Sequence, residues 1–167
     1  DEGIAAELLK DQAHFADDPE AHAPEHSLEG EIPFLQRALK AFKIVPILIN
    51  SREPEAARAV GEAIARAVQG KKALILISSD LAHYPSAADA RAADLSFLKA
   101  VERLDPDFLQ LTGTMLAGAG IRGYDTPACG EPGLLAGIAA AKALGADKAE
   151  VLRYRNSGEV PGVGDAN

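Results

Sequence analysis

Two short apolar runs separated by a helical pattern constrain the fold of this chain more than any other feature. Residues 44–49 (IVPILI) and 73–77 (ALILI) are rich in β-branched side chains and have the length of buried strands. The residues between them predict one amphipathic helix that ends at Gly70, and its apolar face carries Ala57, Val60, Ile64 and Val68. A strand, a helix and a strand in this order predict two parallel strands joined by a right-handed crossover.

The remaining sequence adds helices and one further candidate strand to this unit. Helical patterns are expected in a short segment around residues 4–9 and in residues 27–42, 86–104, 106–117 and 130–144. Residues 150–155 alternate in polarity and predict a strand, whereas residues 15–24 and 156–167 predict loops. The expected class is therefore α/β, with a mostly parallel core sheet.

Acidic residues are concentrated at the front of the chain. The formal net charge is −8, and residues 1–31 contain ten acidic side chains against the single base Lys10. An acidic chain with 5% aromatic residues is a poor candidate for binding nucleic acid, either as duplex or as single strand.

Several classes of protein are excluded by what the sequence lacks. No run of 18 apolar residues is present, and the acidic N-terminus lacks the order of a signal peptide, so we expect no membrane span and a cytoplasmic setting. The single cysteine, Cys129, excludes an internal disulfide framework and a multi-cysteine zinc site.

The first candidate site is the segment 78–84 (SSDLAHY), which follows the second predicted strand. The carboxyl ends of parallel strands are where ligands bind in open sheets. Asp80 is three residues before His83, so its carboxylate can orient the imidazole as a base or a metal ligand. The alternative is that Asp80 caps a turn and His83 is an ordinary surface residue.

The second candidate is Cys129, which lies just before a predicted helix. The amides at a helix N-terminus stabilise a thiolate and favour nucleophilic or metal-binding chemistry. The alternative is a small buried apolar residue. A third candidate is His26 with Glu25 or Glu29 as its partner, for which a local hydrogen bond at a helix start is the alternative. His14 and His22 are expected to be solvated.

Five segments together carry a resemblance to a known family. They are residues 25–34 (EHSLEGEIPF), 44–48 (IVPIL), 78–84 (SSDLAHY), 126–130 (TPACG) and 153–158 (RYRNSG). In this order they resemble the Memo family, whose bacterial and archaeal members are called AmmeMemoRadiSam system protein B. The resemblance covers residues 1–160 as the C-terminal portion of a Memo-like domain and leaves residues 161–167 as a loose tail.

The resemblance implies a fold and a metal-centred pocket. The fold it implies is that of class III (LigB-like) extradiol dioxygenases, a three-layer sandwich with helices on both sides of a mostly parallel or mixed sheet. Cys129 matches a metal ligand, His83 matches an acid/base histidine, and Asp80 lies in the same pocket with His26 and Glu25 on its wall. The family's other two ligands are histidines of an N-terminal half, in P-H-A-G-Y and P-S-H-H motifs that this sequence lacks.

Two functions follow as expectations from this resemblance. One is a metal-dependent, redox-type enzyme that holds iron, copper or zinc in the full-length protein and binds metal weakly or not at all as this chain alone. The other is a non-enzymatic module that binds a peptide or protein in the same pocket. The implied partners are a radical-SAM protein or a peptide. Because half a domain exposes apolar surface, a second copy or the absent half is also expected to associate.

Overall fold

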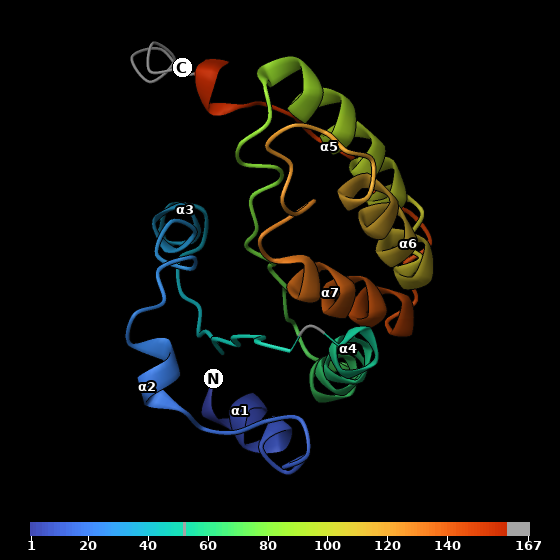
Figure 1. Cartoon of the computed structure of the whole chain (residues 1–167). Helices are drawn as coiled ribbons and strands as arrows, with labels where there is room; N and C mark the ends of the chain where they lie inside the picture. The colour runs from blue at the N-terminus through green and yellow to red at the C-terminus, as the bar shows by residue number, and fades with distance from the viewer. Residues whose placement is uncertain (52, 160–167) are drawn as a thin grey trace. The chain divides into compact units, whose positions relative to one another are not determined.

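The computed structural model describes residues 1–51 and 53–159, and helices are its regular elements (Figure 1). The described helices are α1 (Glu2–Leu8), α2 (Pro19–His22), α3 (Ile32–Ala38), α4 (Pro54–Val68), α5 (Ala87–Glu102), α6 (Pro106–Ala117), α7 (Glu131–Ala143) and the 3₁₀ turn η1 (Ser157–Glu159). The chain divides into two compact units, and each is described by itself. The first consists of residues 1–79 and 130–145, and the second of residues 80–129 and 146–159 of the described chain.

The first unit is organised around the contact between α4 and α7, which lie side by side in Figure 1. Small residues let the two helices approach closely. A Cβ on Gly61 of α4 would lie 2.1 Å from the carbonyl oxygen of Ala136 in α7, so only glycine fits there. On another face of α4, Ala63 and Ala67 form a small apolar cluster with Leu8 of α1. Val45 and Ile47 pack against that cluster.

The second unit is built on the pair α5 and α6. Phe97 of α5 and Leu109 of α6 are fully buried and supply its two largest core side chains. Both helices begin at side chains that accept backbone amides: Ser86 accepts from Asp89, and Asp105 accepts from Asp107 and Phe108. These starts and the end of α6 before Gly118 agree with the sequence-based expectation.

The expected three-layer α/β sandwich with a central sheet is wrong for this chain. The described residues contain no strand, and no backbone hydrogen bond joins residues 44–49 to residues 73–77 within that part of the chain. A strand needs a second extended segment as its hydrogen-bonding partner, and neither run has one among the residues that the structure describes. The helix between the two runs forms as predicted, but α7 rather than a sheet covers it. The candidate strand 150–155 is also unpaired, and Leu152 is 90% exposed.

Other differences from the expectation are local. The helix expected around residues 4–9 begins earlier, at Glu2, because the Asp1 carboxylate accepts hydrogen bonds from the amides of Gly3 and Ile4. The expected loop 15–24 contains α2, which Asp18 caps through the amide of Ala21. Pro33 lies in the first turn of α3, where a proline is compatible with a helix. The tail 161–167 lies outside the described residues.

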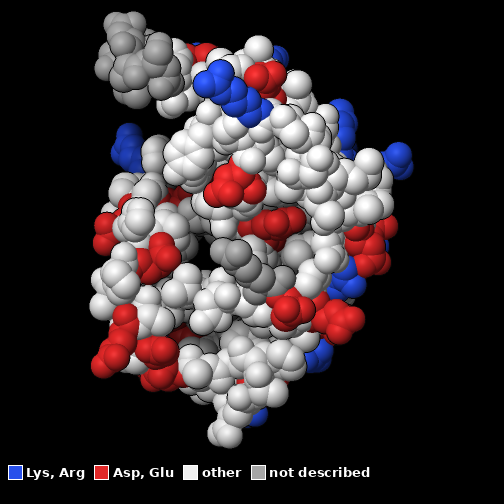
Figure 2. Space-filling model, viewed as in Figure 1, with Lys and Arg blue, Asp and Glu red and all other residues white. Residues whose placement is uncertain are grey.

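Two surface properties bear on function. No described helix combines the length and the apolar character that crossing a membrane requires. On the face shown in Figure 2, acidic side chains gather over the N-terminal segment, whose residues 1–31 contain ten acidic side chains.

Candidate functional site

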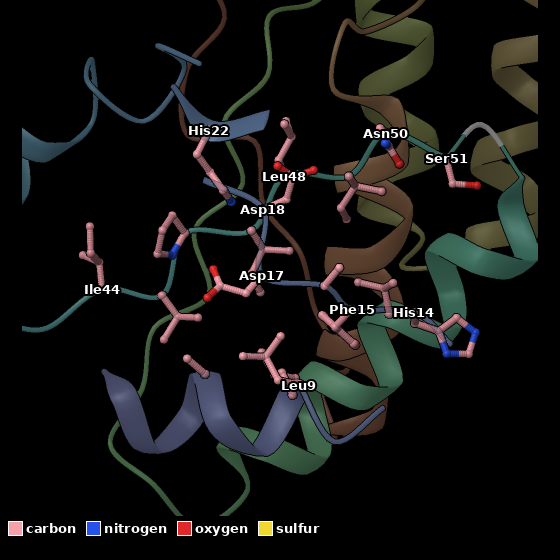
Figure 3. A pocket seen from close by; sticks show the side chains of 18 of the residues that line it. Leu9, His14, Phe15, Asp17, Asp18, His22, Ile44, Leu48, Asn50 and Ser51 are labelled. Atoms are coloured by element: carbon pink, nitrogen blue, oxygen red, sulfur yellow. The ribbon is translucent and has the colours of Figure 1, made fainter. Parts of the chain in front are cut away.

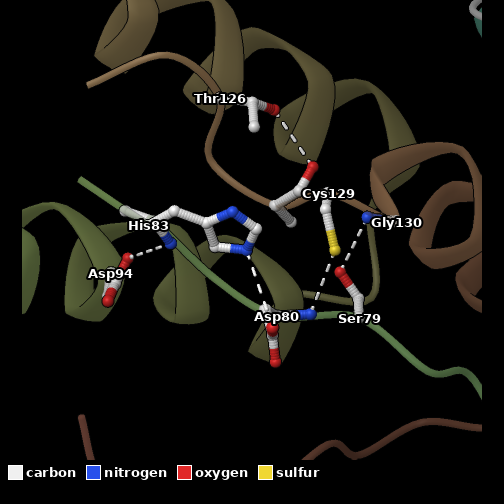
Figure 4. A network of polar contacts seen from close by, with 9 residues as sticks. Ser79, Asp80, His83, Asp94, Thr126, Cys129 and Gly130 are labelled. Atoms are coloured by element: carbon white, nitrogen blue, oxygen red, sulfur yellow. Dashed lines mark hydrogen bonds and ion pairs between the residues drawn. The ribbon is translucent and has the colours of Figure 1, made fainter. Parts of the chain in front are cut away.

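Two loops of the second unit meet at Asp80 and Cys129, and each residue donates a backbone amide to the other. The amide of Asp80 donates to Cys129 Sγ at 3.3 Å, and the amide of Cys129 donates to the Asp80 carbonyl oxygen at 3.2 Å (Figure 4). Cys129 is exposed, so the interpretation as a small buried apolar residue is wrong. The thiol therefore has a fixed position and access to solvent at the same time.

His83 lies on the same loop and is directed toward Asp80. Its Nε2 is 3.6 Å from Asp80 Oδ2, which is an ion pair when the imidazole is protonated but is too long for a hydrogen bond (Figure 4). The ring of Tyr84 contacts the imidazole edge to face, with 5.6 Å between the ring centroids. The sequence-based expectation that Asp80 and His83 are neighbours is met, and both side chains reach solvent.

The two loops also touch at a second point. Gly123 has a φ of +76°, and a Cβ there would lie 2.7 Å from the Tyr84 carbonyl oxygen. A side chain at position 123 would thus be strained twice, by the backbone conformation and by contact. Glycine at this position lets the loop that ends in Cys129 run close to the loop that carries His83.

Asp94 fixes the His83 loop to the rest of the second unit. This carboxylate is only 4% exposed and accepts hydrogen bonds from the amide of Ala82 at 3.1 Å and the hydroxyl of Tyr154 at 2.8 Å. Arg91 places its guanidinium 5.4 Å from the centre of the Tyr154 ring. Burial and the hydrogen bond to Asp94 raise the pKa of the Tyr154 hydroxyl to about 12, so it stays protonated and able to donate well into the alkaline range.

Sequence reasoning missed Asp94 and the role of Tyr154. The available signal was a charged residue on the apolar face of α5. Asp94 is four residues after Ala90 and three before Phe97, so the helical period places it on the same face as these two buried residues. A buried carboxylate on such a stripe needs donors. The sequence does not say that one of them is a tyrosine 60 positions away.

The residues next to this site in sequence make a separate contact in the first unit. Ser79 Oγ accepts a hydrogen bond from the Gly130 amide at 2.9 Å, and Gly130 is the N-cap of α7. A Cβ on Gly130 would lie 2.8 Å from the Ser79 Cβ and 2.9 Å from the Ser78 carbonyl oxygen. Cys129 therefore stands one residue before a helix start that tolerates only glycine.

Glu25 and His26, predicted to line the pocket, belong to the first unit, whereas Asp80, His83 and Cys129 belong to the second. Glu25 has a local role: its carboxylate accepts the amides of His26 at 2.8 Å and Ser27 at 2.6 Å. The hydrogen bond from Ser27 is the main cause that lowers the pKa of Glu25. The assignment of these two residues to the pocket stays a prediction.

The metal-binding capacity of the described chain is limited. Among the described residues, no group of three or more His, Cys, Asp or Glu side chains is placed to hold a metal ion. Cys129 supplies one soft donor, and His83 lies beside Asp80, with 3.6 Å between Nε2 and Oδ2. The described residues alone do not fit a complete metal site.

The contacts described so far define a helical protein with an exposed thiol, an imidazole and a carboxylate at one loop junction. Comparison with known proteins adds the family. The family model described as "Memo-like protein" matches residues 1–167. This chain belongs to that family.

Several curated relatives agree with the assignment. The chain is similar to a MEMO1 family protein of Aquifex aeolicus, with 40% identity over 146 residues, which cover 87% of this chain and 52% of the relative. It is 33% identical over 165 residues to a MEMO1 family protein of Ignicoccus hospitalis, covering 97% of this chain and 55% of that one. A MEMO1 family protein of Methanosarcina mazei is 35% identical over 150 residues, which cover 87% of this chain and 52% of that relative. The chain spans about half the length of these relatives, and no solved structure matches it.

Proposed function

We propose that the loop junction of Asp80, His83 and Cys129 is this chain's contribution to a metal-centred, redox-type pocket of a Memo-like protein. The observation that carries the proposal is the position of Asp80, which contacts the Cys129 sulfur through its amide and the His83 imidazole through its carboxylate. One residue thus contacts both a thiol and an imidazole at an exposed junction. Thiols and imidazoles in such positions serve as metal ligands, and imidazoles also serve as acids or bases.

Each residue has a separate role in this proposal. Cys129 is the thiolate ligand, and a soft sulfur donor favours zinc, copper or iron over hard ions such as Mg²⁺. His83 exchanges a proton with the substrate, while Asp80 orients the imidazole. Tyr84 limits rotation of the ring by contacting its edge.

The remaining ligands are proposed to come from polypeptide beyond the described residues. The chain spans about half the length of its relatives, and its described residues do not complete a metal site. We therefore expect weak metal binding by residues 1–167 alone. Stoichiometric binding is expected when the part of the Aquifex aeolicus relative that this chain does not match is co-expressed with it.

The test measures metal content and alkylation of Cys129 in the same preparations. In the co-expressed protein, Zn²⁺ is expected to be stoichiometric and to slow iodoacetamide modification of Cys129 at least tenfold. Cys129→Ser is expected to remove the metal. Metal retained by Cys129→Ser, or an alkylation rate that Zn²⁺ does not change in the co-expressed protein, would refute the proposal.

The chain offers a matched control for the histidine. His14 is paired with Asp11 at the same three-residue spacing, with 2.9 Å between Nδ1 and Oδ2. His83→Gln is expected to alter the pH dependence of any redox turnover, and His14→Gln is expected to leave it unchanged. Equal effects of the two substitutions would argue against a specific role of His83.

A second candidate, a peptide- or protein-binding module using the same residues, is favoured by the exposure of Tyr84. This aromatic side chain is 74% exposed beside His83, and exposed aromatic residues are common anchors of interfaces. The two candidates differ in their dependence on metal. Binding of a partner that survives Cys129→Ser and is lost in Tyr84→Ala supports the second candidate.

A further inference from the structure

The outer face of α6 is apolar and uncovered. Phe108, Leu111 and Met115 are 43%, 56% and 67% exposed. They stand three and four residues apart on one helix, so they form a single stripe. The opposite side of α6 carries Leu109 and Gly113, which are buried in the second unit. Because a helix that is apolar on both sides is normally covered on both, the outer stripe has the character of a contact surface.

The stripe is also free of charge. Asp107 is the single charged residue of α6. The Thr112 hydroxyl donates to the Phe108 carbonyl oxygen at 2.7 Å, so this polar group is satisfied within the helix. The exposed side of α5, by contrast, carries Arg91 and Lys99. The uncharged stripe is therefore a property of α6 and not of the surface of the second unit in general.

Exposed apolar residues of the first unit have a different setting. Ile44 and Leu48 line a pocket of about 540 Å³ between α1 and residues 44–51 (Figure 3). They belong to an extended segment without a strand partner among the described residues, so their exposure is that of an incomplete sheet element. Asp1 and Asp18 of this pocket already cap α1 and α2. In contrast, α6 is a complete helix, and an absent strand does not account for its stripe.

We propose that the outer face of α6 binds the same face of a second copy of the chain, with the two helices antiparallel. Residues 108 and 115 are equally far from the midpoint between residues 111 and 112. A two-fold axis at this midpoint places Phe108 of one copy against Met115 of the other, and methionine sulfur makes favourable contacts with aromatic rings. Leu111 then faces Thr112 across the same axis. The stripe is thus complementary to itself, as a two-fold interface requires.

The charges at the two ends of α6 fit this arrangement. An antiparallel pair sets the positive N-terminal end of each helix dipole toward the negative C-terminal end of the other. Asp107 lies in the first turn of α6, Arg122 lies five residues beyond its last residue, and both side chains are exposed. The antiparallel pair brings the acidic end of each copy toward the basic end of the other, whereas a parallel pair brings like charges together.

The size of the face sets the expected strength of the contact. About half of each of three large side chains, roughly 300 Å² per copy, is less than the about 800 Å² per partner that a stable complex buries. A permanent subunit would need a larger face. The dimer is therefore reversible and forms at high protein concentration.

The first test follows self-association of residues 1–167 by sedimentation velocity over a range of concentrations. Leu111→Lys and Met115→Lys are each expected to raise the dissociation constant of the dimer at least tenfold. Leu152→Lys is the matched control, because Leu152 is a more exposed leucine of the same unit outside α6, and it is expected to change the constant less than twofold. All three positions are exposed, so the variants should fold, which circular dichroism checks.

A mixture of two variants tests the antiparallel register. Phe108→Lys and Met115→Glu are each expected to weaken self-association at least tenfold. In an equal mixture the introduced cation of one variant meets the introduced carboxylate of the other, beside one intact contact of Phe108 with Met115. The mixture is therefore expected to associate at least fivefold more tightly than either variant alone.

Several results would overturn the proposal. These are absence of self-association, equal effects of Leu111→Lys and Leu152→Lys, or a mixture that associates no more tightly than its components. Loss of the dimer on co-expression with the unmatched part of the Aquifex aeolicus relative would mean that this part covers α6 instead of a second copy. None of these results depends on Cys129 or metal, so failure here is distinguishable from failure of the proposed function.

Discussion

The Tyr154 hydroxyl donates a hydrogen bond to the Asp94 carboxylate at 2.8 Å, although the two residues are 60 positions apart in the sequence. The same carboxylate accepts the amide of Ala82, one residue before His83. A segment near the end of the described chain is thereby connected to the loop of the candidate site. The arrangement makes Asp94 and Tyr154 positioning residues for His83, and this role leads to the first two predictions.

Replacement of Asp94 by alanine is expected to destabilise the protein by about 2–4 kcal/mol, since an amide and a hydroxyl both lose their acceptor. Tyr154→Phe removes only one of the two hydrogen bonds and is expected to cost about 1–3 kcal/mol. Urea denaturation followed by circular dichroism measures both changes. Asp147→Ala, at an exposed carboxylate, serves as the control and should stay within about 0.5 kcal/mol. A change of that small size for Asp94→Ala would contradict the role assigned to the carboxylate.

The raised pKa of Tyr154 makes stability depend on pH in the alkaline range. The hydroxyl ionises at about 12 in the folded protein and at about 10 when unfolded, so the folded state holds this proton more tightly. The resulting stabilisation is fully present below pH 10 and is lost as the pH rises toward 12. Absorbance at the phenolate band, compared between the protein and Tyr154→Phe, isolates this titration. In Asp94→Asn the midpoint is expected to move down toward 10, and an unchanged midpoint would exclude Asp94 as a cause.

The α4–α7 contact is expected to be the part of the first unit least tolerant of added volume. Gly61→Ala would place a Cβ 2.1 Å from the Ala136 carbonyl oxygen, so the helices must separate at a cost of about 2–3 kcal/mol. Gly118→Ala is the matched control, because its nearest neighbour would be 3.5 Å away and its φ of −83° suits alanine. Thermal denaturation of the two variants compares them directly. Equal midpoints would mean that α4 and α7 do not pack as described.

Cys129 is expected to react as an accessible thiol in the native protein. Because its side chain is exposed, one equivalent of a thiol reagent should react without denaturant. Cys129→Ser is expected to change the free energy of unfolding by less than about 0.5 kcal/mol, because surface substitutions have small effects. Titration with a chromogenic disulfide and urea denaturation check the two statements. Protection of the thiol until unfolding would show that Cys129 is buried after all.

The parts of the fold that the sequence predicted are those fixed by local interactions. Ser86, Asp105 with Pro106, and Gly118 mark the ends of α5 and α6, and the structure places the helices between these markers. Capping side chains act within a turn, so their effect is readable from neighbouring residues. Asp1 and Asp18 show the limit of this reading, because the sequence pattern predicted α1 without its capped start and assigned the helix that Asp18 caps to a loop.

The predicted sheet failed because strands depend on distant partners. Residues 44–49 alternate between half-buried and exposed, as a strand does, but their composition cannot say whether another extended segment lies alongside. The helix α4 is amphipathic as predicted, yet an amphipathic face does not reveal whether a sheet or another helix covers it. For the same reason the proximity of Asp80 and His83, three residues apart, was predictable, whereas the partnership of Asp94 and Tyr154 was not.

The division of the chain also has a consequence for the order in which it folds during synthesis. The first unit is discontinuous, because residues 80–129 are inserted between α4 and its packing partner α7. During synthesis α4 is complete before α5, α6 and α7 are made. Its face that later contacts α7, which contains Gly61, therefore stays exposed to solvent until α7 has been synthesised. Docking of α7 is therefore the event that closes the first unit, and it comes only after the Cys129 loop has left the exit tunnel.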